Sequence, residues 1–237
     1  MNFRPQDSRN LTIDQARSGV LSAFMSRVYS WMMLGILVTG AVSFEVGNNP
    51  ELVAQIFQNK PFFWALIIAQ FGSVIFLSTM INRISATAAA ITFLMYSALT
   101  GLTLSMIFVL YTQQSIASAF VTTAVGFGGL SMYGYTTKRD LGPLGSFCIM
   151  ALFGLIAIML LSYFVPGLSG NTMQIGISIA GLLIFAGLTA YDTQRIKAMA
   201  NAPSGALGQM AVYGALILYL DFLNLFLNLL RLMGDRR

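Results

Sequence analysis

The sequence predicts an all-α membrane protein with seven transmembrane helices. Of its 237 residues, 57% are hydrophobic and only 9% are charged, and the mean hydropathy is +0.75. A soluble domain of this length has too little interior to bury so much apolar surface. The apolar residues gather in seven stretches, and each is long enough to cross a bilayer as a helix.

The seven apolar segments follow one another with short connections, several of which carry turn-forming residues such as Pro50 and Pro203. A polar stretch over residues 1–24 precedes them and lacks the apolar core of a signal peptide. We therefore predict a cytoplasmic polar tail over 1–24 and one transmembrane domain over 25–237. The predicted segments cover residues 25–46, 62–80, 85–111, 115–135, 145–165, 172–194 and 207–230.

Lysine and arginine indicate the orientation, because they are enriched in the cytoplasmic loops of membrane proteins. With the N-terminus inside, nine of the 13 basic residues lie on the inner side. These nine are Arg4, Arg9, Arg17, Arg27, Arg83, Lys138, Arg139, Arg195 and Lys197. The outer four are Lys60, Arg231, Arg236 and Arg237. The sequence thus predicts a cytoplasmic N-terminus, with the basic C-terminus as the exception that a six-span chain with a re-entrant last segment would remove. The lack of a signal peptide and the compact loops favour a bacterial inner membrane, with an organelle membrane as the alternative.

Composition narrows the possible chemistry. The chain has one cysteine, Cys148, and no histidine, which excludes an internal disulfide, a zinc site with histidine ligands and a histidine pH switch. The net charge of +5 comes from residues at the segment ends, so it does not suggest nucleic-acid binding. Sensing of pH near neutrality would then require a carboxylate in an unusual environment.

Small residues recur at four-residue spacing in two of the segments. This pattern lets helix backbones approach closely in lipid, so it predicts helix packing at both places. The residues are Ser97, Gly101 and Ser105 in the third segment, and Ser118, Thr122 and Gly126 in the fourth.

Two carboxylates, Asp192 and Asp221, lie well inside the last two segments. A charge within a span costs at least about 2.5 kcal/mol, so such residues are usually functional. The midpoint between them falls at the link that joins the two segments, and antiparallel helices would therefore hold both at a similar depth. Helical periodicity also places polar residues beside each aspartate on one helix face. These faces comprise Gln174, Ser178, Gly181, Thr189 and Asp192, and Asp221, Asn224, Asn228 and Arg231.

A close pair of buried carboxylates predicts a proton switch. Both groups cannot ionise cheaply side by side, so Asp192 and Asp221 would share protons as one unit. When deprotonated, they would offer hard oxygen ligands to a cation such as Ca²⁺. Two carboxylates fall short of the coordination number of calcium, so we expect weak binding, with support from Thr189, Asn224 and Asn228. No other cofactor is predicted.

Arg83, in the link after the second segment, is a candidate latch for this pair. The predicted topology places it on the same side of the membrane as the link between the last two segments, so it could reach either aspartate. An arginine that only marks the cytoplasmic side is the other interpretation. Acid would open the path if it released such a latch, or close it if it removed the cation ligands, and the sequence favours neither direction.

Two motifs resemble the last two helices of the Bax inhibitor-1 family. They are Gly-Leu-Thr-Ala-Tyr-Asp-Thr-Gln at 187–194 and Leu-Tyr-Leu-Asp-Phe-Leu-Asn-Leu-Phe-Leu-Asn-Leu-Leu-Arg at 218–231. The resemblance implies two three-helix layers around a central seventh helix and a pH-sensitive calcium-leak activity. It also implies that Asp192 and Asp221 are the proton sensor and Arg83 the latch. An acidic residue that some members carry in the second span has no counterpart within 62–80.

Two other functions compete with a calcium leak as explanations of these residues. An intramembrane aspartyl protease also uses a Tyr-Asp pair on one helix, but Asp221 follows bulky Leu-Tyr-Leu rather than a glycine motif, so we predict that the chain is not an enzyme. The other alternative is a membrane interaction protein. Some bacterial relatives are regarded as modulators of a membrane-bound ATP-dependent protease, and the polar tail is compatible with such a partner.

Overall fold

The computed structural model confirms the all-α fold. It describes residues 5–165 and 170–236, with the backbone alone for residues 5–17, 163, 171 and 204. The named elements in these ranges are all helical. They are α1 (Pro5–Gly47), α2 (Pro50–Gln58), α3 (Lys60–Met80), α4 (Ala86–Leu104), α5 (Met106–Leu110), α6 (Gln113–Thr136), α7 (Gly142–Phe164), α8 (Asn171–Met199), the 3-10 turn η2 (Ser204–Ala206) and α9 (Leu207–Met233).

Seven helical stretches in the described ranges are long and apolar enough to cross a membrane, as predicted. The third combines α4 and α5, which meet at Ser105. The first predicted span, residues 25–46, lies within α1, which is one continuous helix that also includes most of the predicted polar tail. The side of the membrane on which this part of α1 lies stays a prediction.

The short helix α2 was not predicted from the sequence. It begins at Pro50, and the side chain of Asn49 accepts hydrogen bonds from the backbone N–H groups of Glu51 and Leu52. Asn59 caps α3 in the same way by accepting from Phe62 N–H. Each asparagine side chain accepts from N–H groups that have no partner inside their helix, which stabilises the start of that helix. Helix α2 lies between α1 and α3, where the chain reverses direction.

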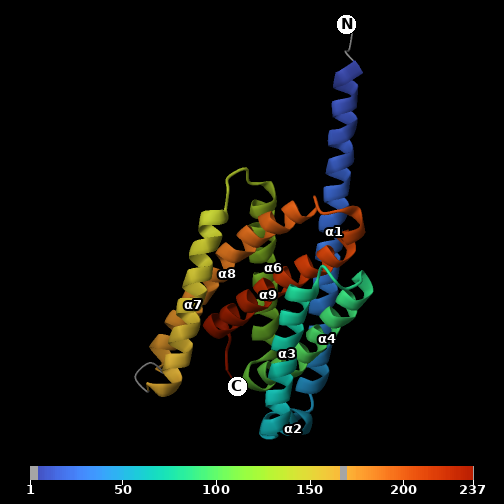
Figure 1. Ribbon diagram of the computed structural model, residues 1–237. Coiled ribbons are helices and arrows are strands. Elements are labelled where there is room, and N and C mark those ends of the chain that lie inside the picture. The colour runs from blue at the N-terminus through green and yellow to red at the C-terminus, as the bar shows by residue number, and fades with distance from the viewer. Residues whose placement is uncertain (1–4, 166–169, 237) are drawn as a thin grey trace.

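Helix α9 forms the centre of the molecule. In its most apolar stretch, 67% of the residues are buried inside the protein, compared with 11% in α3 and in α7. It packs against α1 and α4 on one side and against α6 and α8 on the other. Helices α1, α3 and α4 contact one another through α4, and α6, α7 and α8 contact one another through α8. Figure 1 shows α8 and α9 crossing the more upright helices obliquely.

Small residues allow some of these contacts but not all that were predicted. Ser97, Gly101 and Ser105 are buried, and a Cβ atom on Gly101 would lie 2.9 Å from the backbone oxygen of Thr39. The packing prediction for the fourth segment was wrong, because Ser118, Thr122 and Gly126 are exposed. The buried face of α6 carries Ser115, Ala119, Thr123, Phe127, Ser131 and Gly134 instead.

Candidate functional site

The two aspartates come from adjacent helices, α8 and α9, which are joined by the short connection around η2. Asp192 is 9% exposed and Asp221 is 3% exposed. Both line one cavity, and they are close enough for each to act on the other electrostatically. The fold therefore brings together the pair that the sequence singled out.

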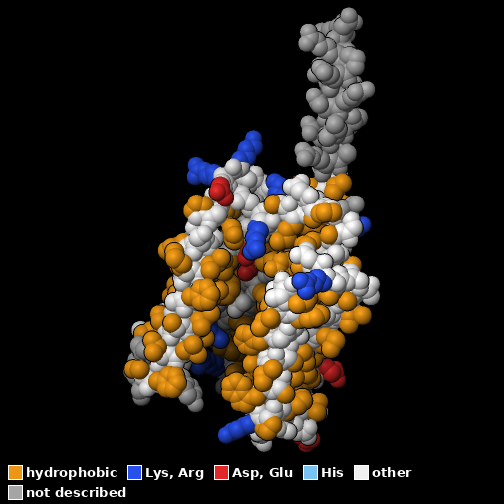
Figure 2. All heavy atoms as spheres, viewed as in Figure 1, with side chains coloured by type: hydrophobic (Ala, Val, Ile, Leu, Met, Phe, Trp, Pro, Cys, Tyr) orange, Lys and Arg blue, Asp and Glu red, His pale blue; other side chains and the backbone are white. Residues whose placement is uncertain are grey.

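We call this space the acidic cavity. It has a volume of about 610 Å³ and is bounded by α3 and α4 on one side, α7 and α8 on the other, and α9. Figure 2 shows the surface hollowed between α7 and α3, with charged side chains on its floor. Apolar residues line most of it, with seven polar exceptions. They are Gln70, Tyr96, Asp192, Asp221, Asn224, Asn228 and Arg231.

Two polar atoms in this lining are buried without a hydrogen-bond partner among the described residues. They are Oδ2 of Asp221 and Nε2 of Gln70. An unpaired polar atom in an interior costs about 1–3 kcal/mol, and native proteins contain few of them. A cavity of this volume has room for several water molecules that could pair with both atoms. The acidic cavity therefore offers both the room and the polar atoms that bound water requires.

Gln70 was missed by the sequence analysis, which noted only that its segment lacks a carboxylate. It is the one amide between residues 62 and 80, and that isolation in an apolar span was the available signal. Whether it faced lipid or protein depended on which helix lies opposite α3.

Of the three predicted supporting residues, two line the cavity. Asn224 and Asn228 donate through their amide nitrogens to the backbone oxygens of Leu220 and Asn224, at 2.8 Å each. Among the described residues, their side-chain oxygens accept no hydrogen bond, so they are available as acceptors. Thr189 is fully buried but is not part of the cavity lining, and its hydroxyl donates to the backbone oxygen of Phe185 at 2.7 Å.

Arg83 lies outside the acidic cavity. Its side chain is exposed, and it forms no ion pair with either aspartate in the described structure. The cation that acts electrostatically on Asp192 is Arg195, about one helical turn further along α8. The latch role of Arg83 stays a prediction, which would need the link between α3 and α4 to move towards the pair.

The donor set fits a weak calcium site better than a tight one. No group of three or more acidic, cysteine or histidine side chains gathers anywhere in the described residues. Calcium takes 6–8 oxygen ligands, so two carboxylates and two amide oxygens would leave positions for water. Such a site would let an ion leave again, as transport requires.

Known proteins resemble this chain over almost all of its length. The family model described as "Inhibitor of apoptosis-promoting Bax1" matches residues 21–237. The chain belongs to the Bax inhibitor-1 family. "Inner membrane protein YbhL" of Escherichia coli is 45% identical over 233 residues, 97% of this chain and 98% of the relative. An uncharacterized protein of Borreliella burgdorferi is 43% identical over 231 residues, 96% of this chain and 98% of the relative.

Family membership and the seven helices together make the chain an integral membrane protein that lies in a lipid bilayer. The relative in Escherichia coli is named for the inner membrane, as was predicted for this chain. Neither the family nor the relative in Escherichia coli is named as an enzyme.

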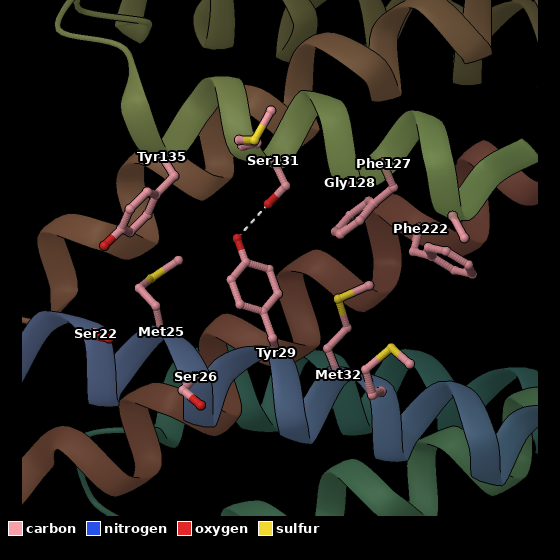
Figure 3. Close-up of a pocket in the computed structure, with 13 residues that line it drawn as sticks. Ser22, Met25, Ser26, Tyr29, Met32, Phe127, Gly128, Ser131, Tyr135 and Phe222 are labelled. Atoms are coloured by element: carbon pink, nitrogen blue, oxygen red, sulfur yellow. Dashed lines mark hydrogen bonds between the residues drawn. The ribbon is translucent and has the colours of Figure 1, made fainter.

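A second cavity lies on the other side of α9, between α1 and α6. We call it the methionine-lined cavity, because Met25, Met32, Met33 and Met132 are among its lining residues. Its volume, about 600 Å³, matches that of the acidic cavity. In Figure 3, Tyr29 and Ser131 meet across it, with Met25 and Tyr135 to one side and Met32, Phe127 and Phe222 to the other.

Two polar residues of the methionine-lined cavity, Tyr29 and Ser131, belong to a chain of hydrogen bonds that continues to Thr193. The hydroxyls of Tyr29 and Ser131 are 2.6 Å apart, and those of Ser131 and Thr193 are 3.0 Å apart. The chain ends where Thr193 donates to the backbone oxygen of Thr189 at 2.7 Å. These groups hold α1, α6 and α8 together, so we assign them a structural role.

Proposed function

We propose that this member of the Bax inhibitor-1 family is a pH-sensitive cation leak channel of a bacterial inner membrane, with calcium as its cation. In this proposal it has no enzymatic activity. Protonation of the Asp192–Asp221 pair gates the path through the acidic cavity. One observation carries the proposal: a buried carboxylate pair shares a large cavity with polar atoms that lack protein partners.

The physical argument is that the pair changes charge with pH while the rest of the cavity does not. A buried carboxylate pair that binds and releases protons alters the local charge by one or two units, which in a low-dielectric space is a large electrostatic change. Asn224, Asn228 and Gln70 carry no titratable group. The pH response should therefore come from Asp192 and Asp221.

The test is calcium flux into liposomes at several pH values, with Asp192→Asn and Asp221→Asn. Each substitution keeps the shape of the side chain and removes its ionisation, so each should flatten the dependence of flux on pH. Ser131→Ala, in the methionine-lined cavity, is the matched control and should keep the wild-type profile. If both asparagine variants keep the wild-type pH profile, the assignment of the sensor is wrong.

Arg83→Gln tests the latch separately. If Arg83 holds the closed state through an aspartate, its removal should raise flux at the pH where the wild type is least active. If Arg83 only marks the cytoplasmic side, flux should not change. Arg195→Gln is the informative companion variant, because Arg195 is the cation that acts on Asp192 in this structure.

A second proposed function is suggested by the N-terminal end of α1. Helix α1 has 43 residues, more than a bilayer requires, and Figure 1 shows it running beyond the other helices at this end. Such an extension suits docking to another membrane protein, and an ATP-dependent protease is the partner that we propose. Deletion of residues 2–20 should abolish that modulation and leave calcium flux intact, whereas loss of flux would favour a role in the leak.

A further inference from the structure

A third cavity, at the C-terminal end of α9, is basic rather than acidic. Its volume is about 530 Å³, and residues from the end of α4 to the C-terminal tail line it. Two guanidinium groups, those of Arg231 and Arg236, belong to the lining. We call it the basic cavity. Its other polar lining residues are Tyr111, Ser162, Gln174 and Ser178.

The fold holds both arginines at this cavity by different means. Arg231 lies in the last turn of α9, where the helix dipole favours a positive charge. Arg236 follows the helix and is held through its backbone, which forms an isolated antiparallel bridge with Tyr111. Next to it, Thr112 N–H donates to the oxygen of Asp235 at 3.2 Å, and Asp235 N–H donates to Ser115 Oγ at 3.0 Å. The tail is thus tied to the start of α6.

No described carboxylate neutralises either guanidinium. Within residues 5–165 and 170–236, Arg231 and Arg236 form no ion pair. Two cations that share one hollow repel each other, and the repulsion is stronger where protein and lipid exclude water. An arginine that only marks the membrane interface would extend into the layer of headgroups, whereas these two line one hollow bounded by α7, α8 and α9.

We propose that the basic cavity binds a phosphate group. Guanidinium groups recognise phosphate through paired, charge-assisted hydrogen bonds, and two of them from different segments can hold one phosphate from two directions. Tyr111 and Gln174 add neutral donors in the same lining. The phosphate could belong to the headgroup of an anionic phospholipid or to free inorganic phosphate.

A bound phosphate would also affect the neighbouring acidic cavity. The two cavities share four lining residues, which are Met159, Ile177, Leu227 and Arg231. Without an anion, Arg231 repels any cation that passes between them; with a phosphate bound, that charge is offset. The basic C-terminal end, which the positive-inside rule left as an exception, thereby gains a role in ligand binding.

Ligand-dependent thermal unfolding of the purified full chain tests this site without measuring flux, so its failure leaves the proposed function untouched. In one arm, inorganic phosphate is titrated against chloride at equal ionic strength. In the other, nanodiscs of phosphatidylcholine are compared with nanodiscs that also contain phosphatidylglycerol. A ligand that binds the native state alone raises the unfolding temperature.

The decisive variant is the double substitution Arg231→Gln with Arg236→Gln. It should need about ten-fold more ligand, or more, for the same rise in unfolding temperature, because charge-assisted hydrogen bonds are lost. Lys60→Gln removes another exposed cation, predicted to lie on the same side of the membrane, and should behave as the wild type. The double substitution Arg231→Lys with Arg236→Lys keeps both charges, so the ligand concentration it needs should lie between those of the wild type and the glutamine variant. It also provides a test of the site if the glutamine variant does not fold.

The two arms identify the source of the phosphate. A rise confined to phosphatidylglycerol nanodiscs supports a lipid headgroup, and a rise with inorganic phosphate supports the free anion. The proposal is overturned if neither arm raises the unfolding temperature of the wild type. It is also overturned if the double glutamine variant responds as strongly as the wild type does.

Discussion

The acidic cavity and the methionine-lined cavity have nearly the same volume, about 610 and about 600 Å³, and flank the same helix α9. Their polar groups differ. The hydroxyls of Tyr29, Ser131 and Thr193 are all paired, while Asp221 and Gln70 each leave one buried atom unpaired. Because unpaired polar atoms are costly, the difference suggests that one cavity stabilises the fold and the other exchanges ligands or protons.

The largest effect on the free energy of unfolding is expected at the contact between α6 and α8, beside the methionine-lined cavity. A Cβ atom on Gly134 of α6 would overlap the backbone oxygen of Ala190 in α8. Gly134→Ala should therefore lower the free energy of unfolding by about 3 kcal/mol, at the upper end of overpacking effects. Gly126→Ala is the control on the same helix, because nothing lies within 4 Å of its Cβ position. Denaturant unfolding in detergent measures both, and equal losses would mean that α6 and α8 do not approach as closely as described.

Replacing Asp221 should raise the free energy of unfolding instead of lowering it. Asp221→Leu removes a buried carboxylate with an unpaired oxygen, keeps the branching at Cγ and adds bulk for which the cavity has room, so we expect stabilisation by about 2 kcal/mol with loss of the pH-dependent flux. Ser131→Ala, which breaks paired hydroxyls, should destabilise by about 1 kcal/mol with flux retained. Unfolding and flux assays on both variants test the comparison directly. Destabilisation by Asp221→Leu would show that the carboxylate is paired, and the contrast between the cavities would fail.

Adding a third carboxylate should raise the affinity of the acidic cavity for calcium. Gln70→Glu places an oxygen ligand where an unpaired amide now lies, so calcium affinity at neutral pH should rise about five-fold. Gln70→Met, of similar size and without charge, is the control and should not raise it. Calcium titration in detergent measures both, and an unchanged affinity in Gln70→Glu would mean that α3 does not contribute to the cation path.

The smallest effect is expected at the edge of the hydroxyl chain. Tyr29→Phe removes one hydroxyl and leaves the bond between Ser131 and Thr193 intact. The free energy of unfolding should fall by only about 0.5–1 kcal/mol, and the pH profile of flux should not change. A changed pH profile would indicate that the methionine-lined cavity takes part in gating.

Several features of the site could be predicted from the sequence because they depend on local signals. Apolar length alone marks the seven spans, and a carboxylate inside a span stands out against it. Helical periodicity also placed Asp221, Asn224, Asn228 and Arg231 on one face of α9, and all four line the acidic cavity. The function of the pair still awaits the flux measurements.

The tertiary structure alone decided which helices lie opposite these faces. The sequence could not tell that Gln70 of α3 faces the pair, or that Arg195 rather than Arg83 acts on Asp192. Nor could it show that α6 buries the face with Ser115 rather than the predicted face with Ser118, since both faces carry small residues at four-residue spacing. Periodicity defines the face of a helix, but its neighbour is set by the packing of the whole chain, because partners far apart in sequence compete for the same surface.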